Sequence, residues 1–272
     1  MLNALVIHLA SFSVLAFAGV LFAVQALARE VGYAFGRRAA KQADAAPEGV
    51  GILVGGMLGL LAFVLALTLS FASARFQERR DGALAEANAI GTSWLRAHAI
   101  GHPRGPEIAR LLEDYTRLRL DFVRADALSG RAEEISRSTN AMQSEIWGHV
   151  AAIVRERPDP VATALMASVN ETFDLATAER FVFAIGFPPQ LFWLLIGMTT
   201  FSMGALGFQL GLRQRPIRIL SLFLLGMWTA TMTIILDLGS ARLGDIRIGT
   251  QVYEWTLQGF QGGVSIPPAP AR

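Results

Sequence analysis

Two adjacent stretches decide the fold of this chain: VGILVGGMLGLLAFVLALTLSFASA, residues 50–74, is followed directly by RFQERRDGALAEANAIGTSWLRAH, residues 75–98. The first has no charged residue and is long enough to cross a hydrocarbon core of ~30 Å at ~1.5 Å rise per residue. The second is charged, and no proline separates the two. The sequence therefore predicts one helix of about 48 residues, ~70 Å long, that runs from the membrane into water.

Two glycines are the weak points of this predicted helix. Gly82 and Gly91 each cost ~1 kcal/mol relative to alanine in a helix interior, so a kink at either position is the alternative. The charged part also carries an apolar stripe at three- and four-residue spacing, which predicts packing against other helices. The stripe consists of Leu84, Ala87, Gly91, Trp94 and His98.

The composition points to a membrane protein. The 272 residues are 53% hydrophobic with a mean hydropathy of +0.42, which is too apolar for one soluble domain. The sequence predicts an all-α integral membrane protein with four transmembrane helices. A cleaved signal peptide is the alternative for the first, but its basic start is missing. The uncharged windows are Leu5–Ala28, Val50–Ala74, Leu191–Leu212 and Ile219–Leu236.

Between the second and third windows the chain is polar and has helical periodicity. Pro106 suits a first helical turn, and apolar residues then recur at three-four spacing up to Phe122. A second such stripe runs from Ile135 to Ile153, and a third helix begins at Pro160. The sequence predicts a helical bundle, of four helices if residues 75–98 join it.

Four regions follow from these patterns. We expect the first transmembrane pair with a basic loop in residues 1–74 and the helical soluble domain, continuing the second span, in residues 75–190. The second transmembrane pair is expected in residues 191–238, and residues 239–272 are expected to form a polar C-terminal tail.

The ends of the first and third spans are similar. LAREVGYAFGRR at 27–38 and MGALGFQLGLRQR at 203–215 both place a glycine, an aromatic residue, two further residues and a second glycine before an arginine. This pattern predicts two helix pairs of like orientation with the bundle inserted between them. The alternative is chance similarity between two glycine-rich spans that end in arginine.

The short loops after the first and third spans are basic, and the positive-inside rule places them in the cytoplasm. The helical insert would then lie in the periplasm. Arginines also flank the opposite side, so the density of charge in the short loops decides this orientation. The loop residues are Arg29, Arg37, Arg38 and Lys41 in one, and Arg213, Arg215 and Arg218 in the other.

Small residues follow one face of the second span. In lipid, such spacing lets helix backbones approach closely. One interpretation is tight packing within one subunit, and the other is an oligomer in which this face lines a central path. The candidate pore-lining residues are Gly51, Gly55, Gly59, Ala62, Ala66, Ser70 and Ser73.

Charged and polar residues continue beyond this face, and in a symmetric oligomer each becomes a ring around the axis, which is how pores set charge selectivity. The alternative is a solvated helix face with local ion pairs. Asp237 lies close to the membrane boundary, where an acid either marks an ion path or, as the alternative, pairs internally with an arginine. The candidate selectivity residues are Arg75, Arg79, Arg80, Glu86, Asn88 and Asp237.

Signals for other functions are weak. The absence of cysteine excludes a disulfide, a thiolate metal site and a thiol nucleophile. His98 and His102 have the spacing of a metal pair, but GHPRGP at 101–106 breaks the helix between them. No phosphate-binding loop, nucleophile elbow or dinucleotide fingerprint occurs, and arginines interleaved with acids argue against nucleic acid. The sequence predicts no enzyme, no cofactor and no metal.

Several of these stretches resemble the bestrophin-like domain family of bacterial and plant membrane proteins, a family of unknown function. The most specific is EANAIGT, residues 86–92, followed by Trp94-Leu95-Arg96. GYAFGRR at 32–38, the stretch from Asn170 to Asp174, and IILDL at 234–238 agree with it. The family usually continues with a second acid and a Pro-Arg-rich turn, whereas Gly239, Ser240 and Ala241 stand here, which puts an acid-pair role for Asp237 in doubt.

The resemblance implies likeness to bestrophins, which are pentameric four-span anion channels whose soluble part lies in the cytosol. A cytosolic soluble part conflicts with the charge-based orientation, which places the helical insert in the periplasm. We keep the charge-based orientation because it comes from this sequence. We therefore predict a homo-oligomeric, anion-leaning ion channel of the bacterial inner membrane, a pentamer by analogy, whose partners are its own copies, inorganic ions and lipid. The alternative is a non-conducting scaffold or sensor whose bundle binds a partner or ligand.

Overall fold

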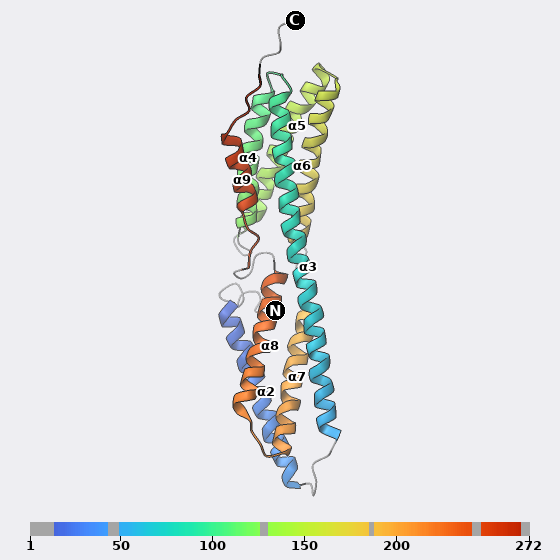
Figure 1. Ribbon diagram of the computed structural model, residues 1–272, viewed down its shortest axis with the longest axis vertical. Coiled ribbons are helices and arrows are strands. Elements are labelled where there is room, and N and C mark those ends of the chain that lie inside the picture. The colour runs from blue at the N-terminus through green and yellow to red at the C-terminus, as the bar shows by residue number, and fades with distance from the viewer. Residues whose placement is uncertain (1–13, 43–48, 126–129, 185–187, 241–245, 268–272) are drawn as a thin grey trace. The chain divides into compact units, whose positions relative to one another are not determined.

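The computed structural model describes residues 14–42, 49–125, 130–184, 188–240 and 246–267, and no strand occurs within these ranges (Figure 1). The all-α prediction is confirmed for this part of the chain. In chain order the helices are α2 (Val14–Gln42), α3 (Gly49–Ala99), α4 (Gly105–Arg124), α5 (Arg131–Glu156), α6 (Pro160–Ala184), α7 (Pro189–Leu212), α8 (Arg218–Gly239) and α9 (Gln251–Gln261).

Four helical segments are long and apolar enough to cross a membrane, as predicted. They are α2, α3, α8 and the segment Pro160–Leu212, whose uncharged part is α7. Part of the first predicted window, residues 5–13, lies outside the described residues. The chain is therefore a multi-pass membrane protein.

The basic stretch after the first window is helical rather than a loop. Helix α2 continues through Arg29, Arg37 and Arg38 to Gln42. No proline stands between Ala28 and Gln42, so nothing in the sequence ends the helix at the last apolar residue. The expectation of a loop beginning at Arg29 is corrected on this point.

The chain divides into two compact units. Unit 1 contains Met1–Phe76 and Gly186–Arg247, and unit 2 contains Gln77–Ile185 and Ile248–Arg272. Helix α3 contributes its uncharged half to unit 1 and its charged half to unit 2. Its hydrogen-bonded course continues through Gly82 and Gly91, so the predicted uninterrupted helix is confirmed.

Unit 1 has apolar residues both inside and outside. Its core joins α2, α3, α7 and α8, while large apolar side chains such as Leu15, Phe63 and Phe201 are exposed on its surface. An apolar exterior around a helical core is what a lipid environment requires. The core consists of Phe17, Leu21, Leu61, Leu65, Ala72, Phe192, Leu195, Met232 and Ile235.

The glycines of the predicted repeat face one another where α2 meets α7. A methyl group built on Gly32 would lie 2.0 Å from the carbonyl oxygen of Gly204, and one on Gly207 would lie 2.0 Å from the carbonyl oxygen of Arg29. Gly36 and Gly211 make equally close reciprocal contacts. The two similar stretches therefore form a reciprocal crossing in which only glycine fits, the type of contact that small residues permit in membranes.

Unit 2 is a bundle of α4, α5, α6, α9 and the charged half of α3. The boundaries of α4, α5 and α6 confirm the three helices predicted from the apolar stripes. Residues 248–272 group with this unit, and α9 packs on α4, so the segment expected as a polar tail contains a helix of the bundle. Its buried apolar side chains include Ile108, Leu112, Tyr115, Ile146, Val150, Ile153, Leu165, Val169 and Tyr253.

Candidate functional site

The small-residue face of α3 is open in the single chain. Gly55, Gly59, Ala62, Ala66 and Ser70 are exposed, whereas Gly51 and Ser73 are half-buried. A methyl group added to Gly55 or Gly59 would meet nothing within 4 Å. Tight packing of these residues within one subunit, the alternative raised by the sequence, is therefore not what the structure has.

Two other faces of α3 have different surroundings. Val54, Leu61, Leu65 and Ala72 are turned into the core of unit 1. Bulky side chains such as Leu60 and Leu67 are exposed on α3 as well, and the exposed Ile52 and Phe63 stand beside the row of small residues. The open surface therefore passes from a mainly small-residue edge, suited to close helix contact, to a bulky edge suited to lipid.

The three arginines after the span have different environments. The guanidinium of Arg75 lies 5.3 Å from the ring centroid of Phe71, Arg79 is buried, and Arg80 is exposed. Of the polar positions that follow, Asn88 is exposed. Among the candidate selectivity residues, Arg80 and Asn88 are therefore the most open to a partner or to an ion in the single chain.

Glu86 is enclosed in unit 2. Its side chain is fully buried, and both of its carboxylate oxygens accept hydrogen bonds from Arg119 of α4. The distances are 2.6 Å from Nε to Oε1 and 3.1 Å from Nη2 to Oε2. A two-point contact of this kind holds the carboxylate in one orientation, here inside the bundle.

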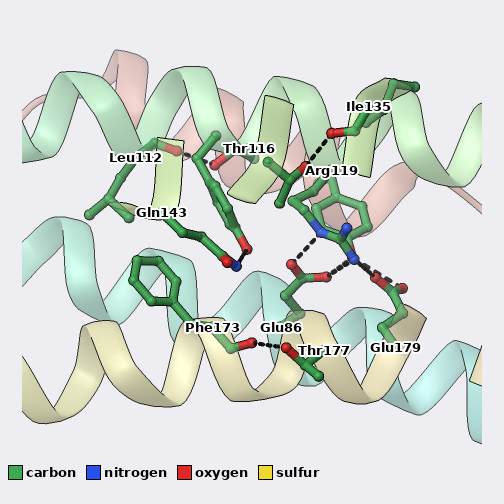
Figure 2. Close-up of polar contacts among 12 residues, drawn as sticks. Glu86, Leu112, Thr116, Arg119, Ile135, Gln143, Phe173, Thr177 and Glu179 are labelled. Carbon is green, nitrogen blue, oxygen red and sulfur yellow. Dashed lines mark hydrogen bonds and ion pairs between the residues drawn. The ribbon is translucent and has the colours of Figure 1, made fainter. Parts of the chain in front are cut away.

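A second carboxyl group shares the same guanidinium. Nη2 of Arg119 also donates to Oε2 of Glu179, which α6 places on the other side of the arginine (Figure 2). The hydroxyl of Tyr253, on α9, lies 2.6 Å from Oε2 of Glu86 and 3.1 Å from Oε2 of Glu179. We call these four residues, from α3, α4, α6 and α9, the carboxylate–arginine cluster.

Burial governs the electrostatics of the carboxylate–arginine cluster. Desolvation, assisted by the charge of Glu86, raises the pKa of Glu179 well above its ordinary value. Burial likewise raises the pKa of the Tyr253 hydroxyl, with a further contribution from Glu86. Although burial alone would lower the pKa of Arg119, the carboxylates of Glu86 and Glu179 raise it, so this arginine stays charged.

A small polar pocket lies beside the cluster. Its volume is about 50 Å³, enough for at least one water molecule, which needs roughly 10–15 Å³. The pocket opens between α5 and α6, where Asn140, Thr177 and Arg180 are exposed. It is lined by Arg119, Ser136, Thr139, Asn140, Gln143, Ala176, Thr177 and Arg180.

The remaining predicted positions are not members of the cluster. Asp237 is buried at the end of α8, and its Oδ1 accepts a hydrogen bond from the backbone N–H of Ile246 at 3.2 Å. The two histidines considered as a metal pair have separate partners. The ring of His98 packs edge-on against Trp94, and Nε2 of His102 lies 3.0 Å from Glu156.

Sequence reasoning found one member of the carboxylate–arginine cluster and missed three. Glu86 was singled out as a charged ring position, whereas Arg119, Glu179 and Tyr253 were not. The signal in the sequence is spacing, since Arg119 stands four residues after Tyr115 and Glu179 three residues after Ala176, each in line with an apolar stripe. Only the packing of α4, α6 and α9 around α3 brings the three side chains to one place.

These features define the class: an all-α membrane protein of four candidate spans with a bundle of polar helices. The chain belongs to the bestrophin-like domain family, whose model matches residues 14–253. The match covers the stretches that carry the resemblance in the sequence. No curated protein and no solved structure matches the chain.

Proposed function

We propose that the protein is a homo-oligomeric ion channel of the bacterial inner membrane in which the small-residue face of α3 surrounds the conducting path. The observation that carries this proposal is the exposure of Gly55, Gly59, Ala62, Ala66 and Ser70 in the single chain. A row of small residues that is left unpacked within one subunit is available for contact between subunits. Membership of the bestrophin-like family supports a membrane function of this kind.

The proposed path leans towards anions. Arg75 and Arg80 follow the uncharged part of α3 within two turns, so copies of them around an axis would favour anions at that end. Glu86, which could favour cations, is neutralised by Arg119 inside unit 2. The ends of α2 and α7 are basic, and the positive-inside rule places such ends in the cytoplasm. The proposal therefore includes an orientation with unit 2 in the periplasm.

Cysteine substitution at adjacent positions of α3 tests the path. The chain has no cysteine, so Ala66→Cys and Leu67→Cys each introduce a single thiol, on the small and the bulky edge respectively. We expect oxidation to cross-link copies of Ala66→Cys but not of Leu67→Cys. In planar bilayers, a charged thiol reagent should change the conductance of Ala66→Cys by at least about twofold and leave Leu67→Cys unchanged, because only a pore-lining thiol reacts from water.

Equal cross-linking of both variants, or equal reactivity, would contradict an axis along the small-residue face. If copies of Ala66→Cys cross-link but the protein carries no current, the result would support self-association through this face and refute the channel function.

Charge reversal tests the selectivity. Arg80→Glu should shift the reversal potential in a salt gradient towards that of a cation-preferring pore, because a ring of positive charge becomes a ring of negative charge. Arg137→Glu is the matched control, since Arg137 is an exposed arginine on α5. The anion preference would be refuted by equal reversal potentials of Arg80→Glu and the unchanged protein.

A non-conducting scaffold or sensor is the second candidate. The carboxylate–arginine cluster and its pocket favour it, because a buried polar network with an opening to solvent is typical of a site that responds to a ligand. Light scattering on the purified protein separates the two: a monomer would exclude the channel and leave the sensor.

A further inference from the structure

The carboxylate–arginine cluster has one negative charge too many for its surroundings. Glu86 and Glu179 are fully buried, and Arg119 is the cation that pairs with both among the residues that the structure describes. An uncompensated buried charge costs several kcal/mol, so the folded state gains from neutralising it. Besides a second cation, a proton on one carboxyl group is the simplest way to do so.

The hydrogen bonds also require a proton. A phenol has one O–H, yet the Tyr253 hydroxyl lies within hydrogen-bonding distance of both carboxyl groups. Ionised carboxylates are acceptors only, so these contacts are all satisfied only when one carboxyl group is protonated and donates.

The polar pocket brings an opening to solvent as far as Arg119 of the cluster. Thr139 and Thr177 each donate their hydroxyl hydrogen to a helix carbonyl, at 2.8 Å and 3.0 Å (Figure 2). Their oxygens can still accept hydrogen bonds from water in the pocket that Arg119 borders, while Nε2 of Gln143 donates to the hydroxyl of Tyr115 at 3.1 Å. Water in this position would reach Arg119, the direct partner of both carboxyl groups, from the solvent between α5 and α6.

Helix α9 is the element most easily released from the cluster. It has 11 residues, and Tyr253 brings its hydroxyl to the carboxyl groups. Its other contacts include the stacking of Phe260 on Trp94, with ring centroids 4.8 Å apart, and an exposed ion pair between Glu254 and Arg124. If both carboxyl groups were ionised, hydration of the buried charges would favour the entry of water. Displacing a short helix with few contacts requires less free energy than displacing a long one.

We propose that Glu86 and Glu179 share one exchangeable proton at neutral pH, and that losing it releases α9 from the bundle. The ionisable groups that face the proton are Arg119 and Tyr115 from α4 and Tyr253 from α9. Because folding raises the pKa of Glu179, the folded state holds more protons than the unfolded state between the two pKa values. The stability from α9 docking is therefore present at low pH and is lost as the pH rises through the folded-state pKa.

Infrared spectroscopy and a spin label on the full-length protein in detergent test the proposal. We expect a protonated-carboxyl band at neutral pH that disappears as the pH rises. A single label at Gln258→Cys, on the exposed face of α9, should become at least about twofold more mobile over the same range.

Glu179→Gln should remove the band and keep the label immobile at every pH, because the amide needs no proton to stay neutral. Glu86→Gln, a second variant of the same pair, should also abolish the pH dependence. Glu171→Gln makes the same change at an exposed position of α6 and should behave as the unchanged protein. A label whose mobility is flat across the pH range, or a band that survives in both cluster variants, would overturn the proposal.

Discussion

Gly207→Ala and Gly32→Ala are each expected to destabilise unit 1 by about 3 kcal/mol, the upper part of the usual range for overpacking. The added methyl group would lie 2.0 Å from a backbone carbonyl oxygen of the facing helix in both cases. A clash with backbone cannot be relieved by rotating a side chain, so α2 and α7 must move apart. Thermal denaturation in detergent, followed by the loss of monodisperse protein, should show a midpoint lower by on the order of 5–10 °C.

Gly19→Ala is the matched control for these substitutions. It makes the same change within α2, the helix that carries Gly32, but its methyl group meets nothing within 4 Å. Its midpoint should stay unchanged or rise slightly, because alanine is the better helix former. The double variant of Gly32 and Gly207 should cost less than the sum of the two, since one separation of the helices relieves both clashes. Equal midpoints for Gly19→Ala and Gly207→Ala would contradict the described crossing.

Arg119→Met is expected to destabilise unit 2 by about 3–5 kcal/mol, the usual result of removing one partner from a buried ion pair. The variant leaves Glu86 and Glu179 buried without their shared cation. The loss should be larger at high pH, where both carboxyl groups tend to ionise. Denaturant titration of the full-length protein, monitored by tryptophan fluorescence, to which Trp94, Trp147 and Trp255 of unit 2 contribute, measures the effect.

A compensated variant separates charge from packing. Adding Glu86→Gln and Glu179→Gln to Arg119→Met should recover most of the lost stability, because no charge is then left buried. Arg110→Met is the control, since Arg110 lies on the same helix but pairs with Glu107 and Asp114 at the surface. Such exposed pairs contribute little. If the triple variant is as unstable as Arg119→Met, the arginine acts through its shape rather than through its charge.

The sequence by itself determined the helices and the four candidate spans. Uncharged windows such as residues 50–74 can satisfy their backbone hydrogen bonds in lipid only as helices, and apolar stripes fixed α4, α5 and α6 within a few residues. It also showed two similar glycine-containing stretches at the ends of the first and third spans, but not that they cross each other. Helix formation and helix bounds are local properties, so the spacing of apolar residues along the chain is enough to predict them.

The tertiary structure alone decided which face of α3 is open and where Glu86 lies. Charge and spacing placed Glu86 on a helix surface, yet Arg119, Glu179 and Tyr253 come from helices 33, 93 and 167 residues away in the chain and enclose it. The period of 3.6 residues shows which residues of a helix share a face, but it does not show which face the neighbouring helices cover. That depends on the packing of all the helices together, which is why the small edge of α3 stays exposed while a charged residue two turns past Arg79 becomes core.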